Sequence, residues 1–170
     1  MDTLRIAIIG AGYFGQLHSS VFKGIPNAKV TAVMNRSIGK AEDVAREHGA
    51  RACSTLDELF CKDDFDAVSI CVPEAAHADT AIYCAEHKKH ILLEKPIATS
   101  AADARRIQKA AKDNGVRLMV AHVLKFDPRY VQLNDAVKSG QLGEISSAYV
   151  RRNGPRAVGE RFGGKVSFLH

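Results

Sequence analysis

The sequence predicts an α/β fold, a doubly wound parallel sheet followed by the incomplete start of an α+β second domain. Three observations predict it. An apolar segment at residues 4–9 runs directly into Gly10-x-Gly12-x-x-Gly15. Strand-like and helix-like segments then alternate with short turns, which favours a parallel sheet. The segment 67–72 is nearly all apolar, as a strand buried on both faces should be.

The elements follow in order along the first part of the chain. Strands are expected at residues 4–9, 29–34, 51–53, 67–71, 90–93 and 117–121. Helices are expected between them, at residues 13–23, 40–48, 56–60, 76–87 and 101–114. Ser100 with Asp103 resembles a capping box, and Asn114-Gly115 is a typical helix end. These strands and crossovers match a doubly wound sheet at residues 1–122.

The pattern changes after about residue 122, and residues 123–170 are expected to begin a second domain that the sequence does not complete. Asp127 and Pro128 have the pattern of a helix start, and this helix is predicted to continue to about residue 138. A further strand is predicted at residues 144–152. Residues 144–170 are expected to be disordered, or paired with another copy through a strand edge, since unpaired edges seek partners.

Composition narrows the class of protein. No apolar run approaches the ~20 residues of a membrane span, and no signal peptide is recognised. The four cysteines lack metal-ligand spacing and are expected to be reduced thiols, which favours the cytoplasm. The formal charge of +5 comes mainly from residues 151–170, which hold five basic residues against one acidic residue. No basic stripe interleaved with aromatics supports a nucleic-acid partner.

The glycine motif predicts a site for the pyrophosphate of a dinucleotide, as in the Rossmann fold. It follows a strand and opens a helix at Tyr13 and Phe14, the context that this fingerprint requires. Gly10 allows a tight turn, Gly12 lets the backbone approach the pyrophosphate, and Gly15 lets the helix pack closely on the strand. The N–H groups at the helix start would face the phosphates. The alternative is a close-packed strand–helix corner without a ligand.

The identity of the dinucleotide is addressed by Asn35, Arg36 and Ser37, which begin twenty residues beyond Gly15. A site that prefers NAD usually has an acidic residue here, which bonds the ribose 2′-OH. Residues 35–37 contain no acidic residue, and they offer a guanidinium and a hydroxyl, so this segment suits a 2′-phosphate. The sequence therefore favours NADP over NAD. The alternative is a solvated turn in which Asn35 still bonds a ribose.

Further candidates lie where the fourth strand ends, the edge at which ligands bind in open α/β sheets. Cys71, Val72 and Pro73 end this strand, and His77 begins the next helix. His77 could donate a hydrogen bond to a phosphate or ribose of the ligand. The alternative is a histidine at a helix start that contacts no ligand.

The fifth strand ends in Glu94-Lys95-Pro96. A dry cleft would disfavour the charged form of Lys95, so that it could exchange a proton with a substrate hydroxyl. Pro96 restrains the backbone and could hold a cis bond that aims the lysine. The alternative is a Glu–Lys pair on the surface.

Four motifs recur in a specific order: the glycine motif, Pro73-x-x-x-His77, Glu94-Lys95-Pro96, and His122 followed by Lys125-Phe126-x-Pro128. In this the sequence resembles the amino-terminal portion of the Gfo/Idh/MocA family of NAD(P)-dependent oxidoreductases, over residues 4–152. The resemblance implies that the nicotinamide lies across the carboxyl edge of the sheet.

It also implies roles for individual residues. Lys95 would be the catalytic residue between nicotinamide and substrate, and Glu94 would border the cofactor's ribose. Lys125 would lie near the substrate, whereas His122 would either face the cleft or only pack beside it.

By the same resemblance, the enzyme transfers a hydride between NAD(P) and a sugar, polyol or related hydroxyl substrate, and the whole protein is a homo-oligomer. Family members are about twice as long, and their second domain carries an Asp and a catalytic His. No Asp follows Asp135 here, so the sequence is expected to be a truncated member or a fragment, inactive on its own. The alternative is a non-catalytic dinucleotide-binding or redox-sensing module. The Lys95 motif disfavours this alternative, because sensing does not need such a lysine.

Overall fold

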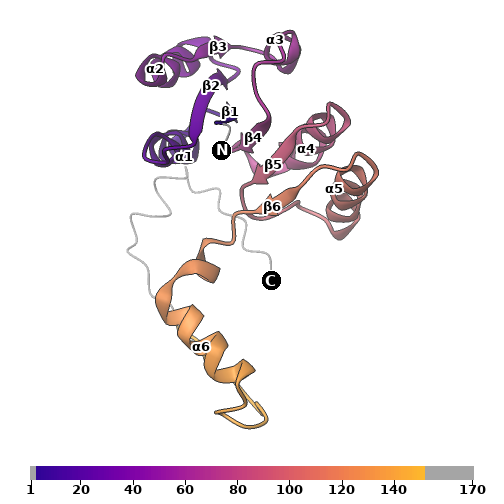
Figure 1. Cartoon of the computed structure of the whole chain (residues 1–170). Helices are drawn as coiled ribbons and strands as arrows, with labels where there is room; N and C mark the ends of the chain where they lie inside the picture. Colours follow the sequence, from indigo (N-terminus) through magenta and orange to yellow (C-terminus); the bar gives the residue numbers. More distant parts are fainter. Residues whose placement is uncertain (1–2, 152–170) are drawn as a thin grey trace. The chain divides into compact units, whose positions relative to one another are not determined.

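The computed structural model describes residues 3–151, and the chain divides into two compact units, Met1–Val123 and Leu124–His170. The first unit alternates strands and helices (Figure 1). Its strands are β1 (Leu4–Ile9), β2 (Ala28–Met34), β3 (Arg51–Cys53), β4 (Ala67–Ile70), β5 (His90–Leu93) and β6 (Leu118–Val120). Its helices are α1 (Tyr13–Lys23), α2 (Ile38–His48), α3 (Leu56–Phe60), α4 (His77–Glu86), α5 (Ala101–Asp113) and the 3-10 turn η1 (Glu74–Ala76).

The sheet confirms the predicted fold class. All its strands are parallel, in the order β3-β2-β1-β4-β5-β6. The order reverses between β1 and β4, and Ile9 at the end of β1 pairs with Met34 of β2 on one side and Ile70 of β4 on the other. The carboxyl ends of β1 and β4 therefore flank the switch point at which open α/β sheets bind their ligands.

Two cores hold the sheet between its helices. Ile6 and Ile8 of β1 pack with the α2 residue Val44, whereas Ala7 and Ile9 join the opposite core, which α4 and α5 cover. Each of these β1 side chains is at most 2% exposed. Alternate side chains of a strand point to opposite faces, so burial on both faces explains why the strand is apolar throughout.

Most helix ends lie within one or two residues of the predicted positions. Ser100 caps α5, since its side chain accepts a hydrogen bond from the Asp103 N–H at 3.0 Å, and Gly115 follows the helix with a φ of +67°. Both were expected from the sequence. The helix predicted at residues 76–87 is shorter, because η1 occupies residues 74–76 and α4 begins at His77.

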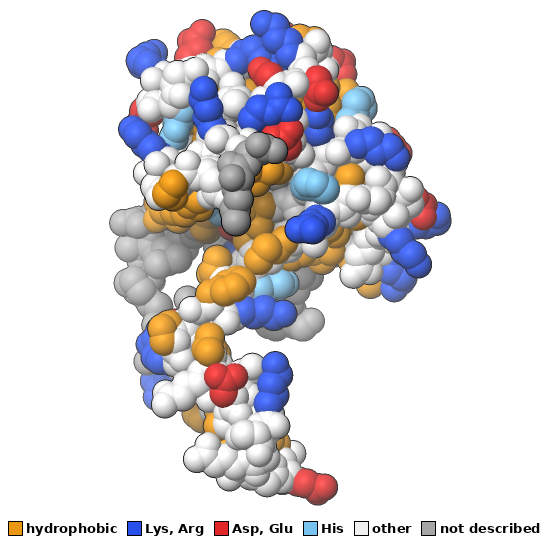
Figure 2. Space-filling model, viewed as in Figure 1, with side chains coloured by type: hydrophobic (Ala, Val, Ile, Leu, Met, Phe, Trp, Pro, Cys, Tyr) orange, Lys and Arg blue, Asp and Glu red, His pale blue; other side chains and the backbone are white. Residues whose placement is uncertain are grey.

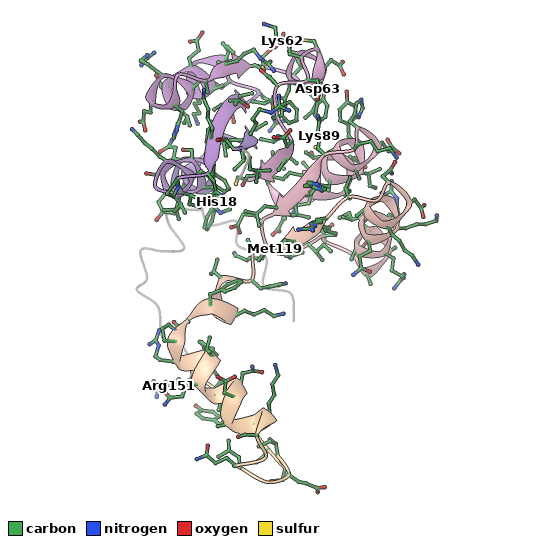
Figure 3. All side chains as sticks on the ribbon, in the orientation of Figure 1. His18, Lys62, Asp63, Lys89, Met119 and Arg151 are labelled. Carbon is green, nitrogen blue, oxygen red and sulfur yellow. The ribbon has the colours of Figure 1, made fainter. Side chains whose placement is uncertain are left out.

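The loop before β4 carries three carboxylates at the amino edge of the sheet, opposite the glycine motif. Each carboxylate pairs with a basic residue of another segment: Asp63 with Lys89, Asp64 with Arg51, and Asp66 with Arg5. Lys89 and Asp63 are labelled in Figure 3. Figure 2 shows basic and acidic side chains mixed over the visible face of this unit. Much of the charge of the folded unit is thus locally balanced.

The chain then passes through η2 (Val123–Phe126) into α6 (Pro128–Lys138), which begins as predicted. The Asp127 side chain accepts a hydrogen bond from the Arg129 N–H at 3.0 Å, and Pro128 occupies the first turn. That residues 123–170 form a separate domain stays a prediction. No helix within residues 3–151 is long and apolar enough to cross a membrane.

The strand predicted at residues 144–152 is wrong over residues 144–151, where the structure has no strand. Tyr149 and Val150 are 88% and 70% exposed there. A strand needs a neighbour to satisfy its backbone groups, and the described part of this segment has no neighbouring strand. Residue 152 and the expectations for residues 153–170 lie outside the described residues.

Candidate functional site

The loop between β1 and α1 uses its three glycines in different ways. Gly10 has a φ of +100°, and a Cβ there would lie 2.6 Å from the Cys71 carbonyl oxygen. A Cβ on Gly15 would lie 1.8 Å from the Gly10 carbonyl oxygen. A Cβ on Gly12 would meet nothing within 4 Å. Gly10 and Gly15 therefore permit the close strand–helix corner, whereas Gly12 leaves open space before the first turn of α1.

The end of β2 supports this loop. The Asn35 side-chain oxygen accepts a hydrogen bond from the Ala11 N–H at 3.2 Å, and its nitrogen donates to the Ser37 carbonyl at 3.0 Å. Asn35 thus ties the glycine loop to the start of α2. Arg36 and Ser37 are exposed beside it. The three residues predicted to select the cofactor are therefore next to the glycine loop. Asn35 also stabilises the conformation of this loop through its hydrogen bonds.

Lys95 follows β5 at the same carboxyl edge, and its peptide bond to Pro96 is cis. Its ammonium group lies 5.7 Å from the centroid of the Phe14 ring, at the start of α1. Lys95 is exposed. The described part of the first unit gives Lys95 an aromatic neighbour in Phe14 and leaves its side chain exposed, so it does not by itself supply the dry cleft on which the predicted proton exchange depends.

A buried polar cluster lies next to Lys95, and its central residue, His18, was missed from the sequence. The His18 Nδ1 atom lies 2.8 Å from Ser69 Oγ, and Nε2 lies 3.1 Å from Glu94 Oε1. The second Glu94 oxygen accepts a hydrogen bond from the Lys95 N–H at 3.1 Å. Ser69 is fully buried, and Glu94 is 6% exposed. Glu94 therefore binds its own neighbours in this structure, and its predicted contact with a cofactor ribose stays a prediction.

His18 could have been noticed from helix periodicity. It lies four residues after Phe14 and four before Phe22, and its ring meets the Phe22 ring edge-on at 6.5 Å. Residues at this spacing share one helix face. Figure 3 labels His18 on α1. A histidine on an otherwise aromatic face would have been expected to pack toward the sheet, although its partners could not have been named.

The cluster holds a buried ion pair at neutral pH. Hydrogen bonds to the Cys71 thiol and the Glu94 carboxylate raise the pKa of His18 to about 9. Burial by itself would raise the pKa of Glu94, but hydrogen bonds from His18 and the Lys95 N–H outweigh it, and the pKa of Glu94 is lowered. An imidazolium has two N–H donors, which suits acceptors on both sides of the ring.

This pair predicts a pH-dependent stability. The pKa of His18 is about 9 when folded and about 6.5 when unfolded, so its contribution is complete below pH 6.5 and is lost as the pH rises through 9. The loss should be about 1–3 kcal/mol. Between pH 6 and pH 10, the free energy of unfolding measured in urea should fall more for the wild type than for His18→Gln. An equal decrease in both proteins would contradict the ion pair.

His77 joins two loops of this edge. One ring nitrogen lies 2.7 Å from the Pro96 carbonyl oxygen and the other lies 3.1 Å from the Val72 carbonyl oxygen, and the residue is 1% exposed. With both nitrogens against backbone, this geometry favours the structural alternative, in which His77 holds the loops after β4 and β5 together. Its predicted hydrogen bond to a ligand stays a prediction.

The remaining candidates are placed as follows. Cys71 and Val72 are half-buried and Pro73 is exposed, directly after β4. His122 is exposed after β6. Lys125 belongs to the second unit, so its role near a substrate stays a prediction, as does that of His122.

Residues 4–122 match the model of the oxidoreductase family GFO_IDH_MocA, which is described by its NAD-binding Rossmann fold. The chain belongs to the Gfo/Idh/MocA family. The resemblance expected from the ordered motifs is thereby confirmed. The NAD-binding Rossmann fold of this family agrees with the strand order of the sheet and with the glycine corner at its switch point.

Several relatives extend this result. The chain is 34% identical over 162 residues to 4-carboxy-2-hydroxymuconate-6-semialdehyde dehydrogenase of Sphingobium, covering 92% of the chain and 51% of that protein. It is 35% identical over 148 residues to scyllo-inositol 2-dehydrogenase (NADP(+)) of Bacillus subtilis, covering 86% and 45%. The WlbA dehydrogenase of Bordetella pertussis, solved with NADH and UDP-GlcNAcA, superposes with a TM-score of 0.82 at 25% identity, covering 85% and 42%. The chain spans about half the length of these relatives.

Proposed function

We propose that this chain binds NADP at the carboxyl edge of its sheet and is the nucleotide-binding part of an oxidoreductase. The enzyme would transfer a hydride between the nicotinamide and a sugar, polyol or related hydroxyl substrate. The observation that carries the proposal is the glycine corner at the switch point, where Gly12 leaves open space in front of α1. Lys95 follows β5 on the same edge.

Different residues along this edge would bind the nucleotide and act on the substrate. The first turn of α1 would bind the pyrophosphate through its N–H groups, since a helix start favours anions. The bound nicotinamide supplies or accepts the hydride. Lys95 would polarise the reacting oxygen and exchange a proton with it, because it is the cation at the end of β5 and its side chain is exposed to an incoming substrate.

A preference for NADP is supported by the turn after β2. No carboxylate stands at residues 35–37 to repel a 2′-phosphate. Arg36 is exposed there, and a guanidinium can bind a phosphate through two parallel hydrogen bonds. Lys40 adds a second exposed cation close by in the sequence. Family members use either NAD or NADP, so this turn is the feature that argues for the phosphorylated form.

Titration of the chain with NADPH and NADH, followed by nicotinamide fluorescence, tests the proposal. NADPH should bind in the micromolar range and about tenfold more tightly than NADH, which corresponds to about 1.4 kcal/mol. Arg36→Asp should reverse the preference, because a carboxylate repels the 2′-phosphate and bonds a ribose hydroxyl. Arg105→Asp, an exposed change on α5, is the matched control. Failure to bind either nucleotide would refute the function, and equal affinities would refute only the preference.

The proposal includes location and assembly. A cytoplasmic protein is proposed because the described cysteines Cys53, Cys61, Cys71 and Cys84 are all free. Homo-oligomerisation of the whole protein and a small hydroxyl or carbonyl substrate are proposed from the family resemblance. Light scattering on the purified whole protein would measure its oligomeric state.

A further inference from the structure

His18 connects three segments of the nucleotide edge. It lies on α1, directly beyond the glycine corner, and its two ring nitrogens reach Ser69 on β4 and Glu94 after β5. Ser69 and Glu94 are 51 and 76 residues away in the sequence. One partly buried side chain therefore joins the helix that would bind the pyrophosphate to the loop that carries Lys95.

The geometry excludes His18 as a group that reacts with substrate. Its side chain is 13% exposed, and both nitrogens already face protein oxygens. A proton donor or acceptor for a substrate must be within hydrogen-bond reach of it. His18 is therefore suited to hold other groups in place.

His18 contacts the Glu94 carboxylate, and the two oxygens of this carboxylate bind different groups. One oxygen contacts His18 Nε2, and the other accepts the hydrogen bond from the Lys95 N–H. Without a partner, a buried carboxylate would turn toward solvent or take up a proton. The first change would break the hydrogen bond from the Lys95 N–H and the second would weaken it, so the backbone at the end of β5 could move.

We propose that His18 is a positioning residue for Lys95: through Glu94 it fixes the backbone from which the lysine side chain leaves β5. The importance of this position for hydride transfer rests on the proposed function. Ser69 completes the arrangement, because it is fully buried and sets the orientation of the imidazole through Nδ1. Residues that orient a reacting group through hydrogen bonds often matter nearly as much as the group itself.

The titratable and charged groups that face His18 come from both packed strand ends. Cys71 lies after β4, with its sulfur 3.5 Å from Nδ1, and Glu94 lies after β5, with Oε1 3.1 Å from Nε2. On its own helix the near neighbour is the Phe22 ring, which carries no charge. When His18 loses its proton, its hydrogen bond to the Glu94 carboxylate is no longer assisted by a positive charge, so this contact should weaken.

The test uses the chain itself, with three variants and a control. His18→Phe removes both hydrogen bonds, His18→Gln keeps one donor without a charge, and Glu94→Gln changes the partner. His87→Gln, an exposed histidine after α4, is the matched control. The first readout is the backbone ¹⁵N shift of Lys95 in carbon-detected spectra between pH 6 and pH 10. The second is the affinity for NADPH compared with 2′,5′-ADP, which lacks the nicotinamide half.

In the wild type and in His87→Gln, the Lys95 shift should change with a midpoint near pH 9, which matches the raised pKa of His18. His18→Gln should lack this transition, and His18→Phe should show the unbonded shift at every pH. NADPH should bind about tenfold more weakly to His18→Phe, whereas 2′,5′-ADP should bind equally to both proteins, since about 1.4 kcal/mol is the scale of one lost hydrogen bond.

A folded His18→Phe with the wild-type Lys95 shift and the wild-type affinity ratio would overturn the proposal. If His18→Phe does not fold, the missing pH transition in His18→Gln and the altered shift in Glu94→Gln decide the matter. If the wild type binds neither nucleotide, the proposed function fails, but the Lys95 shift still decides whether His18 positions this backbone.

Discussion

Replacement of Gly15 by alanine is expected to destabilise the first unit by about 3 kcal/mol or more and to abolish nucleotide binding. The new Cβ would lie 1.8 Å from the Gly10 carbonyl oxygen, a backbone atom that cannot rotate away. Gly10 is itself closely packed, because a Cβ built on it would lie 2.6 Å from the Cys71 carbonyl oxygen. The helix must therefore separate from β1. Urea unfolding measures the loss of stability, and NADPH fluorescence measures the loss of binding.

Gly12→Ala is the matched change within the same loop. Its Cβ meets no atom within 4 Å and its φ is −77°, so stability should change by less than about 1 kcal/mol. Its affinity for NADPH should nevertheless fall about tenfold or more, because the methyl group occupies the space through which a pyrophosphate approaches the backbone. Wild-type stability in Gly15→Ala would contradict the packing argument. Wild-type affinity in Gly12→Ala would contradict the location of the pyrophosphate site.

Lys95→Ala is expected to lower the rate of hydride transfer by about 10²–10⁴, the usual effect of losing a proton-transfer group. Because the chain spans about half the length of its relatives, the assay uses a chimera. Residues 1–122 are joined to the carboxyl-terminal half of the Bacillus subtilis scyllo-inositol 2-dehydrogenase (NADP(+)), and scyllo-inositol oxidation is followed by NADPH formation. The affinity for NADPH should fall by no more than about tenfold, since the pyrophosphate contacts remain.

Lys62→Ala is the control for this substitution. Lys62 is exposed in the loop before β4, at the opposite edge of the sheet (Figure 3), and its loss should leave turnover unchanged. If the chimera with Lys95 is active and Lys95→Ala retains its turnover, the catalytic role of Lys95 is wrong. The chain would then fit the alternative of a dinucleotide-binding module without a catalytic lysine.

Features that depend on neighbouring residues were predictable. Glycine conformations and the strand–helix corner follow from Gly10, Gly12 and Gly15 and the apolar segment before them. The cap of α5 at Ser100 and the start of α6 at Asp127 follow from local hydrogen bonds between residues two or three positions apart. The strand predicted at residues 144–152 was wrong over its described part, since local pattern alone does not supply a pairing partner.

The sequence by itself determined the parallel sheet, the glycine corner at its switch point and the family, because each is encoded by short-range periodicity or by ordered local motifs. Only the tertiary structure decided how the polar residues of that edge are used. In the structure, Glu94 is paired with His18, and both ring nitrogens of His77 lie against carbonyl oxygens. The side chain of Lys95 is exposed. The physical reason is that a buried polar group must find a partner wherever the fold brings one within reach, at whatever distance along the chain.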